Sequence, residues 1–220
     1  MILDSLKLSL LVVLFATAIV AVVGLSFAYL LAKFEFRGKE LLDAALTVPL
    51  VLPPTVTGYY LIVLLGRRGL LGGPLYDLTG WTFAFTWEGA VAASVVVALP
   101  MMVRTARASI ESVDPNFETA SYTLGKSRLA TFFKITLPLA KRGVLAGIVL
   151  SFARALGEFG ATLMIAGNIP GRTQTMPLAI YEAVASGNDR LARLLAVVLT
   201  IVSFTAIYMT NRLSRSRAYG

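Results

Sequence analysis

The amino-acid sequence predicts an all-α membrane protein with about five transmembrane helices. Hydrophobic residues make up 57% of the chain and the mean hydropathy is +0.77, whereas soluble domains are roughly 45–50% apolar. The apolar residues form continuous blocks of about 20, the length that a helix needs to cross the bilayer, and they do not alternate as barrel strands do. We therefore expect one membrane domain over residues 1–220, with spans at about 6–32, 41–65, 87–106, 139–166 and 191–211.

The first block is interpreted as a span and not as a cleaved signal. Its uncharged stretch covers residues 8–32, which exceeds the roughly 7–15 residues of a signal-peptide core. We expect its flanks to contact membrane lipid on both sides of the bilayer.

Prolines mark the second and third spans. Proline removes a backbone donor and kinks a helix, which is tolerated at membrane depth only against protein or a water-filled cavity. Two interpretations stay open for the stretch 49–58: ordinary helix kinking, or the border of a translocation path. The residues concerned are Pro49, Pro53, Pro54, Thr55 and Thr57, while Pro100 is expected to interrupt the third span.

Two opposite charges, Arg154 and Glu158, lie inside the fourth span and share one helical face. A lone charge at the bilayer centre costs at least about 2.5–3.5 kcal/mol, so we expect both to face the protein interior and each other. Gly157 and Gly160 permit close helix approach beside them. The pair has two interpretations, a structural or hinge element and a part of an anion path.

The basic residues predict the orientation of the spans. By the positive-inside rule, segments 33–40 and 104–142 and the tail are cytoplasmic, which places the N-terminus outside and requires an odd number of spans. The net charge of +8 does not indicate nucleic-acid binding, because the basic residues lie between the apolar blocks. Those residues are Lys33, Arg37, Lys39, Arg104, Arg107, Lys126, Arg128, Lys134, Lys141, Arg142, Arg212, Arg215 and Arg217.

The sequence predicts no catalytic, metal or cofactor site in this chain. It contains no cysteine and no histidine, which removes thiolate and imidazole ligands and the commonest general base. It also lacks a phosphate-cradling GxxxxGK[ST] loop. We therefore do not expect the chain to be an enzyme or to hydrolyse ATP itself.

The cytoplasmic segment 107–138 is too polar to span the membrane but is expected to be structured. Asp114 before Pro115 is typical of a helix start, and a helix over 116–124 would stop at Gly125. Ser127 can cap a second helix over 128–136 that ends before Pro138. These features fit either a plain linker with a solvated charged face or a knob that binds a soluble partner.

The same segment resembles the cytoplasmic loop of binding-protein-dependent ABC importer permeases. That family reads E-A-A, three residues, Gly, nine residues, Ile, one residue, Leu-Pro, and the spacing from the glycine onward matches here. Thr119 stands where the family has Glu, and Glu118 lies one residue early, so a motif ion pair to the ATPase is not transferred to it. The resemblance implies ATPase coupling by Glu118, Thr119, Ala120, Gly125, Ile135, Leu137 and Pro138.

The resemblance extends over nearly the whole chain and is sharpest toward the molybdate permeases. It rests on residues 48–59, 66–69, 152–162 and 167–171. It implies a type I importer (MetI-like) permease fold, in the inner membrane, that works by alternating access as a homodimer. Each copy would dock a cytoplasmic ATPase that binds ATP and Mg²⁺, and an extracytoplasmic binding protein would deliver molybdate or tungstate.

The outer loops carry three arginines with two interpretations. Arg67, Arg68 and Arg172 are expected either to contact an acidic binding protein or, for the first two, to anchor a span at the interface. At the level of function, a permease for sulfate or another oxyanion is an alternative. A proton- or sodium-coupled carrier is another, although the chain shows no inverted halves or acidic relay, and a membrane scaffold is a third.

Overall fold

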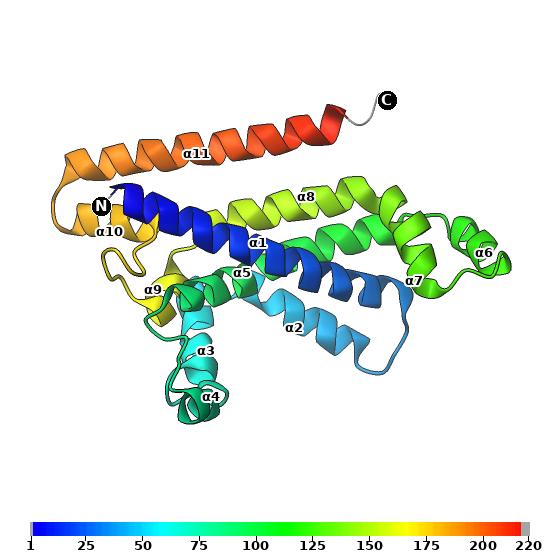
Figure 1. The fold of residues 1–220 in the computed structure, drawn as a ribbon, viewed down its shortest axis with the longest axis horizontal. Coiled ribbons are helices and arrows are strands. Elements are labelled where there is room, and N and C mark those ends of the chain that lie inside the picture. The colour runs from blue at the N-terminus through cyan, green and yellow to red at the C-terminus, as the bar shows by residue number, and fades with distance from the viewer. Residues whose placement is uncertain (1, 217–220) are drawn as a thin grey trace.

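The computed structural model describes residues 2–216, with side chains through residue 208. Every regular element in that range is helical, so the predicted all-α class is confirmed. Four long helices run along the long axis of the molecule in Figure 1: α1 (Ile2–Lys33), α5 (Trp87–Glu111), α8 (Leu137–Leu156) and α11 (Asp189–Ser216). Arg217, assigned above to a basic tail, lies outside the described residues.

Helix α5 forms the centre of the bundle because it packs against both α1 and α8. Its Met102 is fully buried. A Cβ at Gly24 of α1 would lie 2.7 Å from Met102 Cγ, and one at Gly147 of α8 would lie 2.9 Å from its sulfur. Glycines therefore let all three backbones approach one large side chain, as small residues do between membrane helices.

Within the described residues, four helices are long and apolar enough to cross a membrane: Ile2–Lys33, Trp87–Glu111, Arg128–Leu156 and Asp189–Tyr208. They account for the first, third, fourth and fifth predicted spans. The prediction that Pro100 interrupts the third span is wrong, because α5 continues through it. Packing of α5 on both neighbours holds the helix across the one missing backbone bond.

The second predicted span, 41–65, is two shorter helices. Helix α2 (Lys39–Val51) contains Pro49 near its end, and α3 begins only at Pro54 and runs to Leu65. Leu52 and Pro53 between them are extended, with ψ angles of 141° and 137°. A residue before proline avoids the helical region, so the doublet Pro53-Pro54 forces two consecutive extended residues and ends the first helix.

The fourth predicted span, 139–166, is also broken. Helix α8 ends at Leu156, and the short helix α9 (Gly160–Ala166) follows after three residues. At its other end α8 is longer than predicted, because α7 (Arg128–Thr131) and a π-helical turn, η1 (Phe132–Thr136), lead into it without a break. The prediction that this helix ends before Pro138 is wrong: proline lies in the first turn of α8, and the wide π turn accommodates its missing donor.

The two ends of the bundle carry different elements (Figure 1). Helices α6 (Pro115–Thr123) and α7 lie beyond one end, and α9, α10 (Met176–Ala185) and the N-terminus lie at the other. Helix α3 turns away from the bundle axis and leads to α4 (Gly72–Thr79). With eight residues, α4 is too short to be a further span.

Helices α3 and α9 are expected to depend on close packing at Gly58. Gly58→Ala would place a Cβ 2.6 Å from Met164 Cβ and 2.9 Å from the Ala161 backbone, an overpacking that costs about 1–3 kcal/mol. The melting midpoint of the purified protein should fall by about 2–4 °C per kcal/mol. Gly73→Ala is the matched control, since its Cβ would have no neighbour within 3.8 Å; an equal midpoint for both variants would contradict the packing argument.

Candidate coupling and translocation sites

The hairpin of α6 and α7 is built by the turn and capping residues that the sequence predicted. Asp114 accepts a hydrogen bond from the Asn116 N–H at 2.9 Å, and Ser127 accepts one from the Ala130 N–H at 3.3 Å. Gly125, just after α6, has a φ of +73°, a conformation that favours glycine. The chain therefore reverses between the two helices at low cost, and the hairpin is an ordered element.

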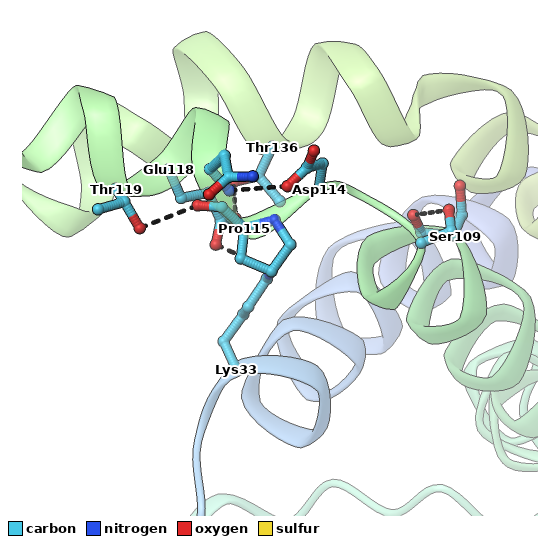
Figure 2. Close-up of polar contacts among 9 residues, drawn as sticks. Lys33, Ser109, Asp114, Pro115, Glu118, Thr119 and Thr136 are labelled. Carbon is cyan, nitrogen blue, oxygen red and sulfur yellow. Dashed lines mark hydrogen bonds and ion pairs between the residues drawn. The ribbon is translucent and has the colours of Figure 1, made fainter.

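The inner face of the hairpin is held to the bundle by polar contacts (Figure 2). The Glu118 carboxylate accepts hydrogen bonds from Lys33 Nζ at 2.9 Å and from the Thr136 hydroxyl at 2.5 Å. Ser121 and Thr131 share a buried hydrogen bond of 2.9 Å. Lys33 is the last residue of α1 and Thr136 the last of the π turn, so α6 is tied to two membrane-spanning elements.

The outer face of the hairpin is apolar and exposed. We define the coupling surface as Phe117, Tyr122, Leu124 and Leu129, all exposed, with Leu124 at 78%. A cluster of exposed large hydrophobic side chains outside the spans is typical of a protein interface. Of the residues predicted for ATPase coupling, Thr119, Ala120, Gly125 and Pro138 are exposed, Ile135 and Leu137 are half-buried, and Glu118 is buried against the bundle.

Sequence reasoning singled out Glu118 but missed both of its partners. Lys33 lies 85 positions away in the chain and was assigned only to the positive-inside pattern. A single carboxylate in a polar segment carries no signal about which distant cation it meets. The buried position of Glu118 follows from the helical period, because Ser121 three residues later is buried on the same face.

The two helix breaks meet in space. A Cβ added at Gly160, the first residue of α9, would lie 2.9 Å from Pro54 Cβ, at the start of α3. Gly58 faces Ala161 and Met164 one turn further along. The residues predicted for a path or hinge are therefore grouped, because the end of one break packs directly on the end of the other.

The ion pair expected inside the fourth span is present. Arg154 and Glu158 lie 2.9 Å apart, and the glutamate side chain is 1% exposed against 28% for the arginine. The second carboxylate oxygen accepts the Ala161 N–H at 2.8 Å. The expectation of one continuous helical face is wrong, because α8 ends at Leu156; the pair instead bridges the break after Gly157 and caps α9.

The remaining path residues lie on both sides of the first break. Pro49 is in the last turn of α2, and Pro53 and Thr55 are exposed. Thr57 is buried, and its hydroxyl has no hydrogen-bond partner among the described residues. A buried hydroxyl without a partner is rare in folded proteins, which makes Thr57 the most polar point of the α3–α9 contact.

The outer arginines differ in their surroundings. Arg67 donates a hydrogen bond to the Tyr76 hydroxyl at 2.5 Å, and its guanidinium carbon lies 4.1 Å from the centre of that ring. It therefore fixes α4 against the end of α3. Arg68 and Arg172 are exposed.

The acidic residues of the cytoplasmic end are engaged in ion pairs. Arg107 contacts both Asp43, at 2.9 Å, and Glu111, at 2.7 Å, and Lys39 contacts Glu35. In residues 2–216 no group of three or more potential metal-ligating side chains lies together.

These features define a multi-pass membrane protein with an ordered hairpin that presents an apolar face to a soluble partner. Residues 21–217 match the family described as "Binding-protein-dependent transport system inner membrane component", and the chain belongs to this family. It is thus a permease subunit and not the ATP-hydrolysing one.

Three curated relatives cover most of the chain. It is 48% identical to the molybdenum transport system permease protein ModB of Escherichia coli (strain K12), over 97% of this chain and 93% of the relative. It is 46% identical to ModB of Haemophilus influenzae, over 88% and 86%. The identity to the sulfate transport system permease protein CysW of Synechococcus elongatus is 34%, over 94% and 72%.

Solved structures share the fold at low identity. A bacterial alginate ABC transporter in complex with an alginate pentasaccharide-bound periplasmic protein has a TM-score of 0.80 at 13% identity, with 99% of this chain and 79% of that chain covered. The MetNI methionine ABC transporter in an inward-facing conformation has a TM-score of 0.71 at 15% identity, over 98% and 93%. The predicted MetI-like permease fold is therefore confirmed.

The Arg154–Glu158 pair should show strong thermodynamic coupling. Glu158→Gln keeps an acceptor for the Ala161 N–H but leaves the arginine unpaired; because Arg154 is partly exposed, we expect a loss of about 1–3 kcal/mol, less than for a fully buried pair. Arg154→Gln with Glu158→Gln should be less harmful than the sum of the single changes, by about 0.5–3 kcal/mol. Unfolding measured in lipid nanodiscs tests this, and strictly additive effects would contradict the pairing.

Proposed function

We propose that this chain is the permease subunit of an ATP-driven importer that moves molybdate across the inner membrane. The observation that carries the proposal is the 48% identity to a molybdenum transport permease over 97% of the chain. We extend it to tungstate, a tetrahedral dianion of the same kind. In this proposal ATP and Mg²⁺ bind to a separate ATPase subunit.

The coupling surface supports docking of that ATPase. Phe117, Tyr122, Leu124 and Leu129 expose apolar area beyond the end of the spans, and burying such area is the main driving force of association. Arg128, which lies over the Phe34 ring at 5.4 Å, adds a basic group beside it. We infer that two copies of the chain pair in the membrane and that each binds one ATPase.

The orientation follows from charge and from the arrangement in Figure 1. Lys33, α6 and α7 lie at the end of the bundle opposite to the N-terminus, and this end carries most of the basic residues. The positive-inside rule then makes it cytoplasmic and places α9, α10 and the N-terminus outside. Arg68 and Arg172, both exposed, would face the molybdate-binding protein there.

Import of a dianion requires an energy source. Moving one charge against a potential of 100 mV costs about 2.3 kcal/mol, so two charges cost about 4.6 kcal/mol. A thousandfold accumulation adds about 4 kcal/mol at 1.4 kcal/mol per decade. A passive pore would release molybdate, which is why we propose alternating access driven by nucleotide, with the α3–α9 contact bordering the path.

Sulfate is the second candidate substrate. The 34% identity to a sulfate permease shows that the two substrate groups share this fold and much of its sequence. We favour molybdate because the identity to two molybdenum permeases is 46–48%.

Uptake in proteoliposomes tests the proposed function. The permease, reconstituted with the ATPase and the binding protein that are co-encoded with it, should accumulate radiolabelled molybdate only when ATP and the binding protein are present, and excess sulfate should compete weakly. Accumulation driven by a proton or sodium gradient without the ATPase would overturn the proposal in favour of an ion-coupled carrier. Preferential uptake of sulfate would reassign the substrate while keeping the mechanism.

Cross-linking tests the coupling surface, and the absence of cysteine in the chain makes it clean. A single Leu124→Cys change places a thiol at an exposed site, whereas Ser121→Cys places one on the buried face. With a short thiol-reactive cross-linker, position 124 should link to the ATPase at least fivefold more efficiently than position 121. Equal linking from both positions would show that the hairpin binds by another face.

A further inference from the structure

Glu118 is the residue closest to the glutamate of the family motif, yet its environment is internal. Its carboxylate has one oxygen on Lys33 Nζ and the other on the Thr136 hydroxyl, as Figure 2 shows. Its side chain is 11% exposed and that of Lys33 is 18% exposed. Both oxygens are engaged within the chain, while Thr119, at the family's glutamate position, is exposed and donates to the Pro115 carbonyl at 3.0 Å.

We propose that Glu118 is a positioning residue that ties the coupling helix α6 to α1 through Lys33 and to the start of α8 through Thr136. A displacement of α6 by the ATPase then reaches two spans at once instead of being absorbed by the loops around Asp114 and Gly125. This proposal rests on the proposed function, because it describes how that importer transmits movement.

The contacts around Glu118 support this role. Tyr29 of α1 packs on Phe132 of the π turn with ring centres 4.6 Å apart, so the two elements that receive the carboxylate already touch each other. Lys33 lies in the last turn of α1, where a cation is favoured by the helix dipole. Charge-assisted hydrogen bonds are strong and directional, and two of them from different elements fix the rotation of α6 as well as its distance from the bundle.

The experiment measures ATP hydrolysed per molybdate imported in the reconstituted complex of permease, ATPase and binding protein. Glu118→Gln should raise this ratio at least threefold, and Glu118→Ala, which also loses the Thr136 contact, should raise it further. The charge-swapped double variant Lys33→Glu with Glu118→Lys should return the ratio to within about twofold of the wild type. A lesion that only reduces folding lowers the amount of assembled complex and leaves the ratio per complex unchanged.

Lys39→Met is the matched control, because its ammonium forms an exposed ion pair with Glu35 and touches no element of the hairpin; its ratio should equal that of the wild type. Unchanged ratios in both Glu118 variants, or a double variant no better than the single ones, would overturn the proposal. A wild-type complex that imports no molybdate would instead count against the proposed function. The two failures are therefore distinguishable.

Discussion

Every peptide group at membrane depth must find its hydrogen bond within the protein, because hydrocarbon offers none. The chain breaks its helices twice under this constraint, at Leu52-Pro53 and after Gly157. The first break uses a residue without a donor, and at the second the Glu158 carboxylate accepts the free N–H of Ala161 at 2.8 Å. Each break is thus stabilised locally, and the two are packed together so that protein rather than lipid covers them.

The same constraint explains why charge appears at the second break. A carboxylate is the strongest acceptor for a helix N-terminus, but an isolated one would be costly in the membrane. Arg154, one turn earlier in α8, offsets that cost at 2.9 Å. The pair therefore joins the ends of α8 and α9 across a segment with no helical hydrogen bonds, and holds it in one arrangement without making it rigid helix.

Much of this architecture could be predicted from local sequence. The blocks of apolar residues located the long helices, and Asp114, Gly125 and Ser127 located the hairpin, because caps and turns depend on residues within a few positions. Proline was less predictable. Pro53-Pro54 ends a helix, whereas Pro100 and Pro138 do not, and the difference lies in the packing of α5 and in the π turn before α8. The partners of Glu118 required knowledge of which distant helix ends meet, which the hydrophobic pattern does not contain.

The hairpin divides its interactions by direction. Its inner face uses hydrogen bonds and an ion pair, which fix orientation, and its outer face exposes apolar side chains, which associate without strict geometry. Because α7, the π turn and α8 form one helical run from Arg128 to Leu156, a force applied to the hairpin acts on a lever that ends at Gly157, beside the α3–α9 contact. The chain thus connects its cytoplasmic surface to the break at membrane depth through one span, and a change at either end must be felt at the other.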